Sequence, residues 1–584
     1  MRRRNIFRTG AVYAASAWVL VQVATQTAPF LHIAEWIVRW LILAAIVGLP
    51  VWIVFAWFCE LTPQGLKLGS EVDPSESIAR RTGQKLDRWI IAILALAVVL
   101  LLTNQLVRQK NASLATDSKA SAVFIPAQSI AVLPLMNESG DPRDRYFSDG
   151  LSEELIAALT QIHDLKVIGR NSSFQFRDSQ QTDNAGIGRK LGVATLVEGT
   201  ARKQGDRVRI VVGLIHAADG TSLWSQTFDR ELKDIFAVQS DIASSVAAAL
   251  KVTFLGRPSQ ARDNPPGGNV AAYNAYLQGK FQEARVTPEG YGKAIEFYDQ
   301  AIRLDPQYAV AYARQSLTWT NYAVEMLGGA EAQEAYTKAR AAAEQALSLN
   351  PELALAHAAR GWLLSYTSFD HTISLAEFHR AVELEPNDSE MKNDLATELA
   401  VLGQLDEAAR LTREALATDP LHGGWYGNLA AYLSALGRLE EAEPAIQKAI
   451  ALQPGGAFYH RQLAIIQIQR GEKEAALRSA NLEPDPTWKI NALALAYDAN
   501  GDRAKSDVQL QILVEQQANE MAVQIAQIYA ARKEPEKMFE WLERAWNQHD
   551  TGITLLLYDP FMLAYRNDVR FTTLCRNAGL TAAN

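Results

Sequence analysis

Hydrophobic and polar residues follow three different patterns along this 584-residue chain. Long apolar runs lie near the N-terminus, short apolar runs bounded by turn residues follow, and helical spacing of apolar and small residues fills the rest. Strands repeat their buried positions every second residue and helices about every 3.6 residues. The pattern therefore predicts membrane-spanning helices, then an α/β segment, then an all-α region.

The three N-terminal runs lie at 9–31, 36–59 and 89–107. About 20 apolar residues are needed to cross a hydrocarbon core roughly 30 Å thick, so we predict three transmembrane helices. Lys and Arg concentrate in the tail 1–8 and the loop 60–88, and loops rich in these residues stay in the cytoplasm. This predicts a multi-pass inner (cytoplasmic) membrane protein whose N-terminus is cytoplasmic and whose C-terminal domains are periplasmic.

A polar linker at 108–125 precedes a predicted α/β (α+β) domain at 126–256. Turn residues at Gly205-Asp206 and Asp219-Gly220 favour tight connections between its last three strands. A helix is expected from Asp149, with Ser152 near its N-terminal cap. The predicted elements, in chain order β-α-β-α-β-β-β-α, are Ser129–Leu135, Asp149–Thr160, Leu165–Ile168, Ala185–Leu191, Ala194–Lys203, Arg207–His216, Thr221–Phe228 and Asp234–Leu250.

A Pro- and Gly-rich linker at 257–269 precedes a repeating segment at 270–555, and 556–584 is expected to cap it. Its prolines recur with spacings that settle at 34 residues, at Pro306, Pro351, Pro386, Pro420 and Pro454. Alanine stands five residues before each, at Ala301, Ala346, Ala381, Ala415 and Ala449. Small residues let two helices approach closely and proline ends the second helix, so the spacing predicts a solenoid of helix pairs.

This spacing is similar to that of the tetratricopeptide repeat. Upstream, the order of four motifs resembles the TolB amino-terminal-like or FlgO-like domain. These motifs are Ser129-Ile-Ala-Val-Leu-Pro-Leu, Tyr146-Phe-Ser-Asp-Gly-Leu-Ser-Glu-Glu-Leu, Leu196-Val-Glu-Gly-Thr and Trp224-Ser-Gln-Thr-Phe-Asp-Arg. The resemblance implies a bacterial sensor or envelope protein with a membrane anchor. Similar chains carry an N-terminal cyclase or a CadC-like DNA-binding domain, but only eight residues precede the first predicted span here, so neither activity is carried over.

Composition narrows the function further. A net charge of −8 argues against broad nucleic-acid binding, and two cysteines are too few for a disulfide scaffold. The nine histidines form no His-x-His or His-Glu-x-x-His pair, and the chain has no phosphate loop and no Gly-x-Ser-x-Gly motif. We therefore predict no catalytic residue, no cofactor and no metal, and a chain that is not an enzyme.

The first helices of stacked pairs line a concave surface. The register set by the prolines places six residues on it: Trp362, Tyr366, Asn393, Thr397, Phe458 and Arg461. Aromatic rings supply contact area, and an amide or guanidinium can fix a peptide backbone or carboxylate. These residues therefore predict a groove for an extended peptide. The alternative is that the groove is plain surface, or is covered by a segment of the chain itself.

The sequence as a whole predicts a membrane-anchored interaction scaffold or a sensory and regulatory component. Its expected partners are a protein or peptide in the groove and the lipid bilayer around three helices, with no nucleic acid; self-association is left open. One alternative is a regulatory subunit of a cyclase or other signalling enzyme that acts in trans. Another is an adaptor of reverse topology, with the solenoid facing the cytoplasm.

Overall fold

A computed structural model describes residues 125–162, 165–177, 183–250, 263–368 and 370–580, together with the backbone of one short hairpin. The chain divides into two compact units, 1–123 and 124–584. The hairpin belongs to the first unit and pairs β1 (Cys59–Thr62) with β2 (Gly65–Leu68) in antiparallel register. All the other described residues belong to the second unit.

The prediction of membrane-spanning helices is corrected. Among the residues that the structure describes, no helix combines the length and apolar character that a membrane crossing requires. The 21-residue helix α11 (Gly329–Leu349) is long enough but carries Glu, Lys and Arg side chains, which the bilayer core disfavours. The fold class with three transmembrane helices and the multi-pass inner-membrane localisation are therefore wrong as predicted. The fold is a mostly helical solenoid with a small sheet domain.

The predicted spans themselves, 9–31, 36–59 and 89–107, lie outside the described residues, with one exception. Cys59, the last residue of the second span, begins strand β1.

The sheet domain has six strands, with β5, β3, β6, β7 and β8 in that order and β4 paired to β6. The strands β5, β3 and β6 run parallel, whereas β6, β7 and β8 form an antiparallel meander. Its elements are β3 (Ser129–Val132), β4 (Met136–Asn137), η1 (Pro142–Asp144), α4 (Arg145–Thr160), β5 (Lys166–Val167), α5 (Arg170–Phe174), α6 (Asn184–Leu191), β6 (Thr195–Gln204), β7 (Arg207–His216), β8 (Ser222–Glu231), η2 (Leu232–Asp234) and α7 (Ile235–Ala249). The predicted elements occur in the predicted order, with the short strand β4 and the short helix α5 added.

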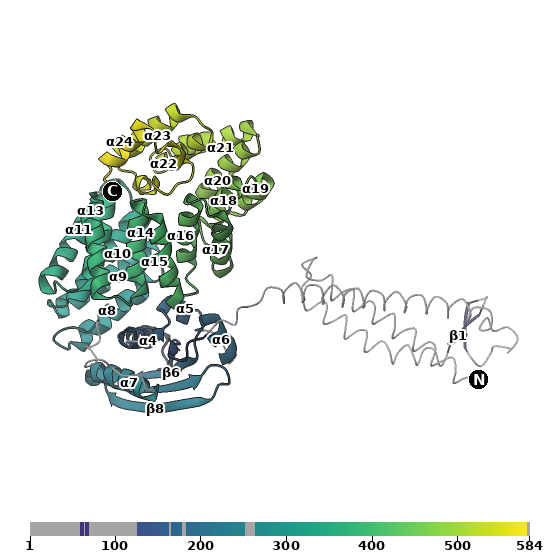
Figure 1. The fold of residues 1–584 in the computed structure, drawn as a ribbon. Coiled ribbons are helices and arrows are strands. Elements are labelled where there is room, and N and C mark those ends of the chain that lie inside the picture. Colours follow the sequence, from purple (N-terminus) through teal and green to yellow (C-terminus); the bar gives the residue numbers. More distant parts are fainter. Residues whose placement is uncertain are drawn as a thin grey trace. The chain divides into compact units, whose positions relative to one another are not determined.

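Alternation along β7 explains the layers of this domain. Val208, Ile210 and the next two residues of the same parity are buried, whereas Arg207 and Arg209 are exposed. The helices α4 and α7 cover the apolar face of the sheet (Figure 1).

The predicted start of α4 is wrong, because α4 begins at Arg145 and Ser152 lies inside the helix rather than at its cap. The Ser152 hydroxyl instead accepts a hydrogen bond from the backbone N–H of Leu135 at 2.9 Å, which ties the helix to the sheet.

Eight antiparallel helix pairs form the solenoid (Figure 1). They are α8 (Val270–Glu283) with α9 (Pro288–Leu304), α10 (Ala309–Met326) with α11, α12 (Ala354–Thr367) with α13 (His371–Leu384), α14 (Ser389–Val401) with α15 (Leu405–Thr418), α16 (Gly423–Ala435) with α17 (Leu439–Leu452), α18 (Tyr459–Gln469) with α19 (Lys473–Leu482), α20 (Pro486–Ala499) with α21 (Arg503–Gln516), and α22 (Ala522–Ala531) with α23 (Pro535–Asn547). The chain ends with η3 (Thr551–Leu555), η4 (Met562–Tyr565) and α24 (Val569–Asn577).

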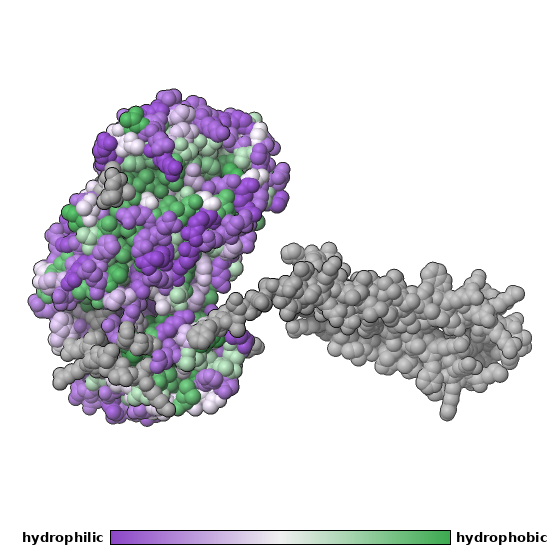
Figure 2. Space-filling view, in the orientation of Figure 1, coloured by the Kyte–Doolittle hydropathy of each residue, from purple (hydrophilic) through white to green (hydrophobic). Residues whose placement is uncertain are grey.

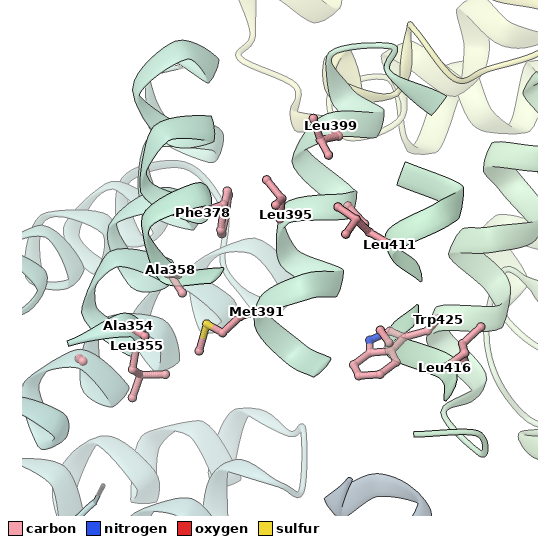
Figure 3. Close-up of a cluster of buried hydrophobic side chains, with 14 of the residues drawn as sticks. Ala354, Leu355, Ala358, Phe378, Met391, Leu395, Leu399, Leu411, Leu416 and Trp425 are labelled. Atoms are coloured by element: carbon pink, nitrogen blue, oxygen red, sulfur yellow. The ribbon is translucent and has the colours of Figure 1, made fainter. Parts of the chain in front are cut away.

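The small residues found in the sequence pattern sit where two helices of a pair meet. All five alanines that precede the recurring prolines are fully buried, and so are Ala408 and Ala442 in the middle pairs. Between them the larger side chains of several helices fill one continuous core, part of which is drawn in Figure 3. Gly403 and Gly437 end the first helices of two pairs with φ values of 74° and 72°, a conformation that favours glycine. The predicted helix-pair repeat is therefore confirmed.

Candidate binding surface

The first helices of successive pairs contact one another along the solenoid, so together they line one side of it. The face drawn in Figure 2 is largely hydrophilic, with smaller apolar areas between polar side chains. The six residues predicted for the groove all come from first helices or from the residue that precedes one. The structure divides them into two groups.

The first group is centred on α12. Trp362 and Tyr366 are half-buried, and their rings stack with centroids 5.6 Å apart and planes at 14°. The other edge of Trp362 reaches the seam of its helix pair, where it meets Phe378 edge-on at 5.2 Å. Trp362 also donates a side-chain hydrogen bond to Asp394 of α14. The tryptophan therefore links the open surface, the seam and the next repeat.

The α14 members of this group are Asn393 and Thr397. Asn393 is only 7% exposed, and its Oδ1 accepts no hydrogen bond within the described part of the chain. Thr397 donates to the backbone carbonyl of Asn393 at 2.9 Å and also bonds to Tyr432 of α16. A buried carbonyl oxygen without a donor is costly, so Asn393 is a place where a ligand N–H would be favoured.

Asp394 stands beside these residues and was not anticipated. Burial, followed by the nearby charges of Glu390 and Asp388, raises the pKa of Asp394 to about 8. Glu390 lies one turn earlier on the same helix, so the two carboxyl groups share a face of α14. The sequence did contain this i, i+4 pair of acids, but helix spacing does not reveal how far water is excluded.

The second group, Phe458 and Arg461, lies around Trp488 of α20. The ring of Phe458 is 4.5 Å from that of Trp488, and the guanidinium of Arg461 lies 5.0 Å from the same ring. Arg461 is buried, and it donates to Asn491 at 2.6 Å and to Gln527 at 2.7 Å. Burial lowers the pKa of Arg461 to about 10. Phe458 is exposed, whereas Arg461 is committed to contacts inside the solenoid.

A segment from the end of the chain lies between the two groups. Tyr558 packs edge-on against Tyr432 of α16, and Leu557 lies against Gly403, where an added Cβ would be 3.4 Å from it. Asp559 accepts a hydrogen bond from Gln527, the residue that also binds Arg461. A segment of the chain itself therefore covers this stretch of the repeats. The repeat spacing could not reveal it, because the segment lies beyond the last repeat.

A cavity of about 340 Å³ lies where the sheet domain meets the solenoid. Eight carboxylates and three cations line it, from α4, α5, α8, α10, α14 and the loops that precede α8, α14 and α16. Glu153 bridges Arg170 at 2.5 Å and Lys280 at 2.6 Å. Burial alone would raise the pKa of Glu153, but the two cations outweigh it and hold that pKa at about 2. These pairs fix α4 against α5 and against the end of α8.

Buried hydrogen bonds complete this junction. The backbone N–H of Ser172 donates to Asp419 at 2.7 Å, and the Ser172 hydroxyl bonds to the same carboxylate. Gly169 N–H donates to the carbonyl of Thr418 at 2.8 Å. The side chain of Gln239 on α7 donates to the Tyr273 hydroxyl at 2.7 Å. The sheet domain is therefore packed against α8 and against the loop between α15 and α16. Across the described residues, no group of three or more His, Cys, Asp or Glu side chains is placed to hold a metal.

Comparisons with known proteins agree with the repeat architecture. A family model described as tetratricopeptide repeat matches residues 426–455, which cover most of the α16–α17 pair. A Rhizobium meliloti protein provisionally named adenylate cyclase 3 is 32% identical over 207 residues. That match covers 35% of this chain and only 35% of the relative.

Several solved structures are similar to parts of the chain. A tetratricopeptide repeat protein from Parabacteroides merdae is 16% identical, with 43% of this chain and 99% of that one covered and a TM-score of 0.32. Yeast Tom70 is 14% identical, with 52% and 67% covered and a TM-score of 0.33. PilF from Pseudomonas aeruginosa is 17% identical, with 36% and 91% covered and a TM-score of 0.29. Scores this low support no argument about function.

Proposed function

We propose that this chain is a tetratricopeptide scaffold that binds a partner protein rather than a catalyst, and that an extended segment of the partner lies on α12 and α14. The observation that carries the proposal is the buried Oδ1 of Asn393, which lacks a donor in the described chain, on the helix next to the half-buried stack of Trp362 and Tyr366. With the Asn393 side chain turned toward the open surface, a peptide backbone would supply an N–H to the amide and apolar area to the rings. Large aromatic residues are the usual energetic anchors of protein interfaces.

Thr397 and Phe458 extend this surface in the proposal, one on each side of the C-terminal segment. Arg461 contributes indirectly, because its guanidinium holds Gln527 and stacks on Trp488 beneath Phe458. A partner that contacts Phe458 therefore rests on a platform that Arg461 keeps in place.

The test compares tryptophans in two settings. Trp362→Ala should lose partner capture, whereas Trp319→Ala should keep it, because Trp319 packs in the α10–α11 pair beside Lys338. Both variants lose an indole from a first helix, so their melting temperatures should fall by similar amounts. The difference between the two variants should then appear only in partner capture. Capture that is lost equally by both variants, or by neither, would remove the surface from consideration.

We also propose that the sheet domain is a TolB amino-terminal-like or FlgO-like domain, with the motifs at Ser129–Leu135 and Trp224–Arg230 as the support.

A second candidate function is regulation of a cyclase or related signalling enzyme in trans. It is favoured by the 32% identity to the provisionally named adenylate cyclase. The test is the rate of cyclic AMP production by that relative with and without the purified full chain. An unchanged rate would count against this second candidate.

A further inference from the structure

The segment that follows α23 differs from an ordinary cap, because it reaches past its own repeat. Its apolar residues Ile553, Leu556 and Met562 are fully buried against α22 and α23. Asp559 at its tip bonds to Gln527 of α22, whereas Leu557 and Tyr558 turn to surfaces of the fourth and fifth helix pairs. An end cap needs only to cover the last pair, so these contacts call for another explanation.

Each tip residue meets a different kind of site. Leu557 lies against the turn at Gly403, within the same apolar cluster as Val401 at the end of α14. The Tyr558 ring packs on Tyr432 of α16, with centroids 5.7 Å apart and planes at 87°.

Asp559 receives a hydrogen bond from Gln527, through which it is linked to the buried cation Arg461. The same carboxylate accepts from the backbone N–H groups of Phe561 and Met562 at 2.9 and 3.0 Å, which fixes its orientation. The tip thus presents an apolar, an aromatic and an acidic side chain in succession to three complementary sites.

We propose that Leu557, Tyr558 and Asp559 form an intramolecular ligand on the inner side of the solenoid, and that an external partner displaces it. The partner segment would carry an apolar residue, an aromatic residue and a carboxylate in succession. This proposal rests on the proposed function, since the sites of the tip residues adjoin the surface on α12 and α14. The proposal defines the chemistry of the partner segment, because a segment that competes with the tip must make the same contacts as Leu557, Tyr558 and Asp559.

The test uses the full chain and a labelled synthetic peptide of residues 554–561. Tyr558→Ala should bind this peptide at least fivefold more tightly than the unchanged chain does, because the internal copy no longer competes. A peptide in which the tyrosine is replaced by alanine serves as the negative probe. Tyr565→Ala is the matched control, since Tyr565 belongs to the same terminal segment but packs on Phe539. It should bind the peptide as the unchanged chain does.

A second measurement does not depend on peptide affinity. A cysteine introduced by Thr397→Cys reports access to the surface near Tyr432, and its maleimide labelling is followed by mass spectrometry of that peptide. Labelling should be at least fivefold faster in the Tyr558→Ala background than with Tyr558 present. A smaller change in either measurement, in protein whose melting shows that it is folded, overturns the proposal. If Trp362→Ala still loses the partner in that case, the proposed function stands without the internal ligand.

Discussion

The ring of Tyr558 meets that of Tyr432 edge-on, with centroids 5.7 Å apart and planes at 87°. Tyr432 belongs to the fifth helix pair, whereas Tyr558 follows the last one. Solenoids are generally stabilised by contacts between neighbouring repeats. This pair instead joins the end of the chain to its middle, so the stability of α16 depends on the C-terminal segment.

A double-mutant cycle measures that dependence. Tyr432→Leu and Tyr558→Leu should show a coupling of about 0.5–1.5 kcal/mol, the range for an aromatic pair beyond its buried area. Chemical denaturation of the four proteins gives the free energies. Strictly additive effects would mean that the two rings contribute independently.

Asn393→Ala separates binding from stability. The change removes an oxygen that has no hydrogen-bond donor among the described residues, so melting should shift little. Partner capture should weaken by about 1–3 kcal/mol if the amide accepts a bond from the partner. Trp362→Phe is the companion variant, because it keeps an aromatic ring near Phe378 but loses the hydrogen bond to Asp394. Normal capture by both variants would contradict the proposed anchor.

The helix-pair seam should behave differently. Ala408→Leu or Ala442→Leu forces a larger side chain into a fully buried position, and such overpacking costs about 1–3 kcal/mol. Thermal melting measures the loss. Gln447→Leu on the exposed side of α17 is the control and should change stability by less than about 0.5 kcal/mol. Equal melting temperatures for seam and control variants would place the seam elsewhere.

The raised pKa of Asp394 predicts that the stability of the folded chain depends on pH. Its pKa is raised from 3.8 to about 8, so between these values the folded chain keeps a proton that the unfolded chain has released. The unfolded state then binds fewer protons, and stability falls as the pH rises through this window. Asp394→Asn should melt like the unchanged protein near pH 4 and at a higher temperature near pH 9. Parallel melting curves over this range would contradict the raised pKa.

The junction between sheet domain and solenoid is tested at Asp419. Asp419→Ala leaves the buried N–H and hydroxyl of Ser172 without their acceptor, a loss of about 1–3 kcal/mol. Calorimetry should show a lower or split transition as the two parts lose their shared contact. Thr418→Ala, which keeps the backbone carbonyl that binds Gly169, is the control and should leave one transition near its original position. An unchanged single transition in Asp419→Ala would argue against the docking.

The sequence pattern predicted the helix pairs and strands whose residues repeat at a regular spacing. Prolines and alanines at 34-residue spacing placed the helix pairs correctly, because a seam between close helices tolerates only small residues. Alternation in Arg207–His216 placed β7 correctly, because one face of the sheet is buried. Ser152 was misplaced, since a serine among acids resembles a cap whether or not its hydroxyl points into a domain core.

Contacts between residues far apart in the chain leave no periodic signal in the sequence and were not predicted. The Tyr432–Tyr558 contact joins residues far apart in the chain, and the burial of Arg461 depends on Asn491 and Gln527 in later repeats. The groove residues were predicted from their positions at the first helix of each pair. Helix spacing does not show which of these positions another segment of the chain covers. The apolar composition of the N-terminal runs predicted membrane helices, and no helix among the described residues has the length and apolar character of a membrane span.

The most direct test of the proposed scaffold function is site-specific photocrosslinking in living cells. Benzoylphenylalanine at position 366 replaces one ring of the Trp362–Tyr366 stack by another, and the same group at Lys448 on the exposed side of α17 is the control. We expect a defined adduct with one partner protein from position 366, absent from position 448 and abolished when Trp362→Ala is added. Adducts of the same pattern from both positions, or an adduct from position 366 that Trp362→Ala leaves unchanged, would contradict binding at this surface.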